Sequence, residues 1–171
     1  MWGPRGSLQG QKGGVMSHAL HRILFVCHGN ICRSTMAQFV MEELVRRAGR
    51  ERAFRIDSAA TSTEEIGSAP HPGTVAKLRE VGIPVGRHRA RQVRRAEYDA
   101  WDLIVYMDSE NERGLQRILG GDPERKVVRL LDFTDAPRDV ADPWYTGDFD
   151  ATYRDVMAGC TALLARLAPG A

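Results

Sequence analysis

The sequence predicts an α/β domain in which a doubly wound, four-stranded parallel sheet carries helices on both faces. Short continuous apolar runs, such as residues 23–26, are typical of strands that are buried on both faces of a parallel sheet. Segments with apolar residues at helical spacing alternate with these runs, as in chains that build βαβ units. At 171 residues the chain has the length of one ordinary domain, and no linker or repeat divides it.

The elements follow one another in a regular order. We expect strands at residues 23–26, 53–56, 103–107 and 127–130, and helices at residues 34–48, 74–81, 108–119 and 149–167. Apolar residues at helical spacing mark the first helix, namely Met36, Phe39, Val40, Leu44 and Val45. The inner face of the last helix is expected to hold Tyr153, Val156, Met157, Cys160, Leu163, Leu164 and Leu167. Glycines at positions 49, 82 and 120 are expected to end the first three helices.

Residues 1–20 differ in composition from the rest of the chain. Glycines recur there among polar residues, and the apolar stretch of a secretory signal is missing. We therefore expect a disordered N-terminal extension, followed by a single folded domain over residues 21–171.

Composition and charge narrow the possible functions. Hydrophobic residues make up 43% and charged residues 27% of the chain, and the net charge is only +2. This near balance argues against a protein that mainly binds nucleic acid. The apolar runs are too short to cross a bilayer, so no membrane partner is expected. Three cysteines are too few for a disulfide scaffold and fit a reducing compartment, which predicts a cytoplasmic protein, and we expect a monomer.

The segment after the first strand has the features of an anion-binding loop. It consists of Cys27, His28, Gly29, Asn30, Ile31, Cys32, Arg33 and Ser34, and a helix begins at its end. Such a loop points successive backbone N–H groups inward, and Gly29 and Asn30 tolerate the positive φ that the bend needs. The helix N-terminus adds partial positive charge, and the planar fork of Arg33 can bind two oxygens of a tetrahedral dianion. These eight residues predict a phosphate-binding site.

Cys27 lies at the base of this loop, where the same field favours a thiolate, and Ser34 is placed to donate a hydrogen bond to it. We interpret Cys27 as a nucleophile toward the bound phosphorus centre. Two alternatives are open at this point: a small buried hydrophobe that ends a strand, or half of a zinc site with Cys32. The histidines and Cys160 lack the spacing of further zinc ligands, so no metal is predicted.

From Val26 to Ser34 the sequence resembles the signature of the low-molecular-weight protein tyrosine phosphatases. The resemblance covers about residues 22–168 and continues, in the family's order, through residues 57–61, 82–83, 88–92, 107–108 and 142–145. It implies a four-stranded parallel sheet and a protein-tyrosine-phosphatase that hydrolyses phosphotyrosine through a phosphocysteine intermediate, without a metal or an organic cofactor. It also implies phosphotyrosine proteins as substrates, and inorganic phosphate or vanadate as active-site ligands.

The same resemblance implies supporting roles for four residues. Asn30, Ser58 and His88 match a polar network that holds the phosphate loop in shape, although a purely structural histidine explains His88 almost as well. Cys32 matches a second loop cysteine that can trap Cys27 as a reversible disulfide. A simple packing thiol is the alternative for Cys32.

Asp142 is the best candidate for a general acid. A thiolate that attacks a phosphate monoester expels a poor leaving group unless a carboxylic acid protonates it. Pro143 stiffens the loop, and Trp144 and Tyr145 are expected to form an apolar wall that keeps the carboxyl protonated and packs an aromatic substrate. From the residues alone, a surface Asp-Pro turn is an equal alternative. The resemblance favours Asp142 as general acid, together with Cys27 and Arg33 as catalytic residues.

Three features complicate the expected specificity. Thr35 stands where the family usually has proline, a mild loss of pre-organisation. Glu64 stands where many relatives place an aromatic residue in the substrate cleft, so it either repels acidic phosphopeptides or is a solvated rim residue without effect. The basic residues 87–95 are expected to form a solvated face, or to steer an acidic phosphoprotein to the site.

Other activities of similar chains are less well supported by the residues. Arsenate reduction uses two more cysteines, and residues 82–106 contain none. Protein-arginine phosphatases carry threonine in place of Ile31. A non-catalytic phosphate-binding module would lack Cys27, Arg33 or Asp142, and a nucleotide P-loop is excluded because no lysine has glycine before it and serine or threonine after it.

Overall fold

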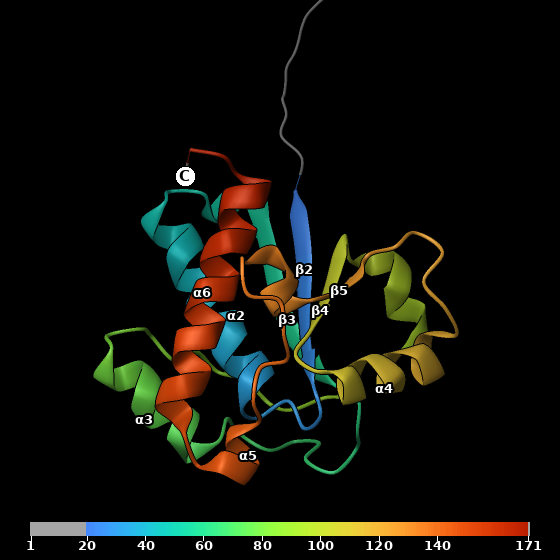
Figure 1. Cartoon of the computed structure of the whole chain (residues 1–171), viewed down its shortest axis with the longest axis horizontal. Coiled ribbons are helices and arrows are strands. Elements are labelled where there is room, and N and C mark those ends of the chain that lie inside the picture. Colours follow the sequence, from blue (N-terminus) through green and yellow to red (C-terminus); the bar gives the residue numbers. More distant parts are fainter. Residues whose placement is uncertain (1–19, 171) are drawn as a thin grey trace, which may run out of the picture.

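A computed structural model describes residues 20–170 of the chain. Its four strands form one parallel sheet: β2 (His21–Cys27), β3 (Phe54–Ala60), β4 (Leu103–Tyr106) and β5 (Val127–Arg129). The order across the sheet is β3-β2-β4-β5, so the chain adds strands first to one side of β2 and then to the other (Figure 1). The predicted doubly wound parallel sheet is confirmed. The expected N-terminal extension lies almost wholly outside the described residues.

Within residues 20–170, five α-helices and three short 3₁₀-helices connect or follow the strands. The α-helices are α2 (Arg33–Arg47), α3 (Pro72–Glu80), α4 (Ser109–Leu119), α5 (Pro143–Thr146) and α6 (Phe149–Leu167). The 3₁₀-helices are η2 (Glu51–Ala53), η3 (Arg95–Ala100) and η4 (Leu130–Phe133). The four predicted helices match α2, α3, α4 and α6 to within two residues at each end. Helix α5 and the 3₁₀ turns were not predicted, because segments of three to six residues are too short to show a helical period.

The second strand is longer than the sequence predicts. We expected it at residues 53–56, yet β3 continues to Ala60. Its second half pairs in register with the end of β2, with Ser58 opposite Phe25 and Ala60 opposite Cys27. Strands are enriched in β-branched and aromatic residues, and none occurs among Ser58, Ala59 and Ala60. The extension of β3 to Ala60 therefore depends on its pairing with β2. This extension places Ser58 beside the loop that follows Cys27.

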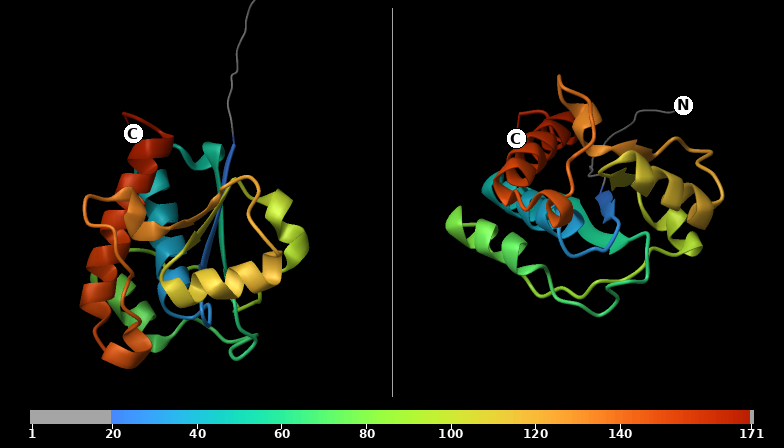
Figure 2. Two further views of the ribbon diagram at one scale, coloured as in Figure 1. Left: turned by 45° about the vertical axis from the view of Figure 1, so that its right-hand side comes forward. Right: turned by 60° about the horizontal axis from the view of Figure 1, so that its bottom comes forward.

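The apolar run of β2 is buried on both sides. Ile23 and Phe25 face a core shared with α2 and α6, whereas Leu24 and Val26 face a core shared with α4 and η3. Side chains at all four positions are fully buried. Figures 1 and 2 show α2, α3 and α6 on one side of the sheet and α4 on the other. Coverage of both faces explains why this strand is a continuous apolar run rather than an alternating one.

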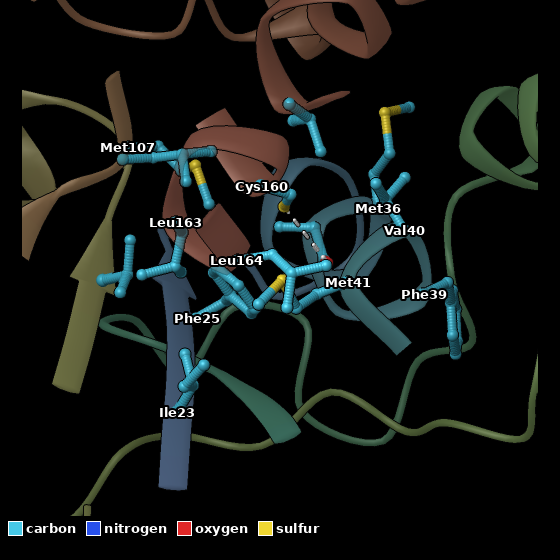
Figure 3. Close-up of a cluster of buried hydrophobic side chains, with 14 of the residues drawn as sticks. Ile23, Phe25, Met36, Phe39, Val40, Met41, Met107, Cys160, Leu163 and Leu164 are labelled. Carbon is cyan, nitrogen blue, oxygen red and sulfur yellow. Dashed lines mark hydrogen bonds between the residues drawn. The ribbon is translucent and has the colours of Figure 1, made fainter. Parts of the chain in front are cut away.

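Packing of α6 against α2 fixes the helix that begins at the predicted phosphate loop. Cys160 and Leu163 of α6 lie against α2 and the sheet in the larger core, in which Met36 and Met41 of α2 are also fully buried (Figure 3). The sulfur of Cys160 is 3.7 Å from the carbonyl oxygen of Ala37 in α2. Burial raises the pKa of Cys160, so it is a packing thiol.

The predicted inner face of α6 is confirmed in part. Val156, Cys160, Leu163 and Leu164 are buried, whereas Tyr153, Met157 and Leu167 are only partly buried against the same core. Gly159 lies on this face as well, because a Cβ at that position would lie 2.4 Å from Cγ of Leu130. The close approach of α6 to η4 therefore requires glycine at position 159.

The strand order determines where a ligand can bind. Connections leave β2 in one direction and β4 in the other, so the carboxyl ends of these two neighbouring strands border a crevice. The loop from Cys27 to Arg33 follows β2, and Asp108 follows β4. Every helix among the described residues is too short or too polar to span a lipid bilayer.

Candidate active site

The segment between β2 and α2 wraps tightly, with Cys27 at one end and Arg33 at the other. Asn30 has a φ of 59°, in the left-handed region, where asparagine is tolerated better than most residues. Gly29 could also tolerate a positive φ, but it does not adopt one. A Cβ at Gly29 would lie 3.4 Å from Cγ of Glu65, which is an ordinary contact. Within this loop only Asn30 has a positive φ.

Cys27 is 3% exposed and is the last residue of β2, and its sulfur lies at the N-terminal turn of α2. The backbone N–H of Ser34 donates to its sulfur over 3.4 Å, and the sulfur and the hydroxyl oxygen of Ser34 are 3.1 Å apart. Thr35 donates its hydroxyl to the carbonyl oxygens of Ile31 and Cys32 at 2.9 and 3.0 Å. Thr35 thus ties down the loop with a side chain where a proline would stiffen the backbone.

Asn30 is the centre of a buried hydrogen-bond network. Its side-chain nitrogen donates to the hydroxyl oxygens of Ser34 and Ser58 at 2.8 and 3.0 Å. Its side-chain oxygen is 2.8 Å from Nε2 of His88 and accepts the backbone N–H of Arg91 at 3.1 Å. The amide is therefore fully satisfied, which leaves the hydroxyl hydrogen of Ser34 free to point at Cys27. The structure brings together the supporting residues that the sequence predicted.

Gln38 completes this network. Ser58 donates its hydroxyl to Oε1 of Gln38 over 2.6 Å. Burial lowers the pKa of His88, against the opposing effect of Asp57, so the ring is neutral and its Nε2–H donates to Asn30. Sequence analysis missed Gln38, which shows no signal beyond its place on the first helix.

The basic run at residues 87–95 is only partly a solvated face. Arg87, Arg89, Arg94 and Arg95 are exposed, as expected. Arg91 is not: its guanidinium pairs with Asp57 at 3.0 Å and with Glu97 at 2.9 Å, and its N–H holds Asn30. For Arg91 the prediction is wrong, because long-range pairing gives it a structural position behind the phosphate loop.

Arg33 is 2% exposed, and its guanidinium is hydrogen-bonded through Nη1 and Nη2. Nη1 donates to Oδ2 of Asp108 at 2.7 Å and to the carbonyl oxygen of Val140 at 2.8 Å, and Nη2 is 3.3 Å from Oδ2 of Asp142. Nε has no hydrogen-bond partner among residues 20–170. Burial opposes the charge, but Cys27, Asp108 and Asp142 outweigh it and raise the pKa of Arg33. A buried cation with an unused N–H lies beside the cysteine.

Asp142 caps the short helix α5. Its Oδ1 accepts the backbone N–H of Trp144 at 3.0 Å, and Pro143 occupies the first helical position. Trp144 and Tyr145 line the same pocket as this carboxyl and are 59% and 84% exposed, so the expected apolar wall stays a prediction. The neighbours of the carboxyl are the guanidinium of Arg33 and the backbone N–H of Trp144.

Cys27, Arg33 and Asp142 line one pocket of about 310 Å³. Its lining comprises Cys27, His28, Gly29, Ile31, Cys32, Arg33, Glu64, Glu65, Glu110, Asp142, Trp144 and Tyr145. His28 Nε2 lies 3.1 Å from Oε1 of Glu64, a contact that sequence analysis did not foresee. Within the described chain, no three His, Cys, Asp or Glu side chains are grouped so that they could hold a metal ion.

Comparison with known proteins agrees with this geometry. The family model described as low molecular weight phosphotyrosine protein phosphatase matches residues 22–170. The chain belongs to this family. It is therefore a phosphatase, a hydrolase of the low molecular weight class.

Relatives of known structure or name share most of the chain. A Bacillus subtilis protein named low molecular weight protein-tyrosine-phosphatase YfkJ is 40% identical over 147 residues, 85% of this chain and 94% of its own length. Its crystal structure matches with a TM-score of 0.84 over 87% of this chain and 95% of that one. The human low molecular weight phosphotyrosine protein phosphatase is 35% identical over 88% of this chain and 98% of its own. A Drosophila arginine phosphatase, with a TM-score of 0.78, 24% identity and coverage of 87% and 99%, shows the fold alone.

Proposed function

We propose that this low molecular weight phosphatase hydrolyses phosphotyrosine in proteins, with Cys27 as nucleophile, Arg33 as phosphate ligand and Asp142 as general acid and base. The observation that carries the proposal is the unpartnered Nε–H of Arg33. It belongs to a fully buried cation that lines the same pocket as the thiol of Cys27. A phosphoryl oxygen would satisfy this N–H and release Nη2 from Asp142.

The first step transfers the phosphoryl group to sulfur. The thiolate of Cys27 attacks phosphorus, the S–P bond forms and the bond between phosphorus and the tyrosine oxygen breaks. Asp142 gives its proton to the departing phenolate, and both Arg33 and the loop N–H groups stabilise the equatorial oxygens.

The second step returns the enzyme to its starting state. Asp142, now a carboxylate, takes a proton from a water molecule that attacks phosphorus. The S–P bond breaks, inorganic phosphate leaves, and the hydroxyl of Ser34 donates to the restored thiolate. No metal or organic cofactor enters either step. Inorganic phosphate, and vanadate as its analogue, are the expected ligands of the loop from Cys27 to Ser34.

Cys32 is proposed to protect Cys27 by forming a disulfide with oxidised Cys27. Burial, followed in size by the charge of Cys27, raises the pKa of Cys32 to about 12, so little of it is thiolate near neutral pH. Capture of Cys27 by this thiol is therefore expected to be slow. Cys27, Cys32 and Cys160 are all free in the structure, and the mechanism needs a reduced thiol. We accordingly propose that the protein works in the cytoplasm, which is reducing. We also propose that it works as a monomer.

A substrate panel tests the proposed function. Steady-state rates would be measured with p-nitrophenyl phosphate and with peptides carrying phosphotyrosine, phosphoserine or phosphoarginine, for the wild type and for Cys27→Ser. We expect turnover of the aryl phosphates only, inhibition by vanadate, and loss of activity by about 10⁴-fold or more in Cys27→Ser. Retained activity in that variant would contradict the mechanism. Faster hydrolysis of phosphoarginine would contradict the proposed substrate.

A further inference from the structure

The exposed and partly exposed residues Glu64, Glu65, Glu110, Trp144 and Tyr145 form the mouth of the pocket, which carries an excess of negative charge. Three glutamates line it: Glu64 and Glu65, from the segment after β3, and Glu110, from the first turn of α4. We call these three residues the acidic rim. Only two of the other lining residues can carry positive charge, His28 and Arg33. Arg33 is already shared between Asp108 and Asp142, so it does not neutralise the rim.

The rim carboxylates are poorly compensated, unlike other acids near the site. Asp108 and Asp142 face Arg33, and Asp57 and Glu97 face Arg91. Within residues 20–170, by contrast, no ion pair involves Glu65 or Glu110. Glu65 accepts one hydroxyl, from Ser68 at 3.1 Å, and Glu64 has only the imidazole of His28.

The buried floor shows how a substrate must lie relative to this rim. The free Nε–H of Arg33 lies in the same pocket as Cys27, which places the phosphoryl group of a substrate at the floor. The phosphotyrosine ring then rises toward the mouth, and the neighbouring residues of the substrate meet the acidic rim. Trp144 and Tyr145, 59% and 84% exposed, border the same mouth. Aromatic faces and carboxylates both attract a guanidinium or an ammonium group.

We propose that the acidic rim selects phosphotyrosine sites that carry an arginine or lysine next to the phosphotyrosine. This specificity rests on the proposed function of the pocket. Each pairing of a rim carboxylate with a basic side chain at an exposed site is expected to raise kcat/KM by about two- to fivefold, and an acidic side chain is repelled by the same charges.

Matched peptides test the proposal. Three phosphotyrosine peptides would differ only in the residues beside phosphotyrosine: arginine, alanine or glutamate. At low ionic strength we expect kcat/KM for the arginine peptide to exceed that for the glutamate peptide by about tenfold, and the ratio to shrink as salt is added. The ratio should fall toward one in a Glu64→Gln, Glu65→Gln, Glu110→Gln triple variant, because glutamine keeps the shape and removes the charge.

Glu51→Gln is the matched control. It removes an exposed carboxylate from η2, before the amino end of β3 and so at the opposite end of the sheet from the pocket. We expect it to keep the wild-type preference. Equal rates on the arginine and glutamate peptides, or an unchanged ratio in the triple variant, would overturn the proposal. If the wild-type protein hydrolyses neither p-nitrophenyl phosphate nor the alanine peptide, the proposed function is overturned, and the specificity with it.

Discussion

Asn30 holds the loop at the floor of the pocket from behind: it is fully buried, and both the oxygen and the nitrogen of its side-chain amide are hydrogen-bonded. At the mouth Trp144 is 59% exposed, and its ring contact is an edge-to-face approach to His71 with centroids 5.8 Å apart. Buried polar groups must be paired, so the floor tolerates few changes. Exposed aromatic and acidic side chains can change at little cost in stability. The proposed chemistry therefore depends on tightly held groups at the floor, whereas the proposed specificity depends on exposed groups at the mouth.

The largest predicted effect separates chemistry from structure at Asp142. Asp142→Asn keeps a side chain that can cap α5, so the fold is expected to survive, but it replaces the carboxylic acid with an amide that cannot act as an acid or a base. Hydrolysis of a phosphotyrosine peptide should fall by about 10²–10⁴-fold. The loss should be smaller with p-nitrophenyl phosphate, whose leaving group needs less protonation. Equal losses on both substrates would argue against a general acid.

The next effect concerns the stability of the floor. Asn30→Ala leaves Ser34, Ser58 and His88 without their shared partner, and we expect it to lower the free energy of unfolding by about 1–3 kcal/mol. Urea denaturation would measure this loss. Asn30→Gly removes the same hydrogen bonds but accepts the φ of 59°, so it should be more stable than the alanine variant. Wild-type stability in both variants would show that the network is dispensable.

His88 links the floor to pH. Its pKa in the folded protein is lowered from 6.5 by burial, so the unfolded chain binds the proton more readily. The stability that neutral His88 contributes is complete above pH 6.5 and declines as the pH falls from 6.5 through the lower folded pKa. His88→Gln keeps an N–H donor and does not titrate. Urea midpoints at pH 5 and pH 7.5 should differ less in this variant than in the wild type, and an identical difference would exclude the role of His88.

The smallest effect is predicted at the mouth. Trp144→Ala should raise KM for phosphotyrosine peptides by about two- to tenfold, through the loss of aromatic packing, and change kcat little. Because Trp144 is mostly exposed, the melting temperature should hardly change. Tyr145→Ala, at an 84% exposed position, serves as the comparison and should raise KM less. A large loss of stability in Trp144→Ala would mean that the mouth, like the floor, supports the fold.

The sequence alone predicts those parts of the fold whose residues are consecutive in the chain. The apolar run of β2, the helical spacing in α2 and the loop between them are consecutive in the chain, so their pattern predicts a strand, an anion-binding bend and a helix. Cys27, Arg33 and Ser34 could be singled out for the same reason. Asp142 was a candidate because of its neighbours Pro143 and Trp144, but only the family resemblance favoured it over a surface turn.

Tertiary structure alone decided the partners that hold these groups in place. Asp108 meets Arg33 across 75 positions of sequence, and the carbonyl oxygen of Val140 does so across 107. Gln38 reaches Ser58 only because the end of β3 pairs with β2. Such contacts depend on strand order and helix packing, which no short segment encodes. Local sequence patterns therefore predict the candidate reacting groups, whereas the fold determines their orientation and charge environment.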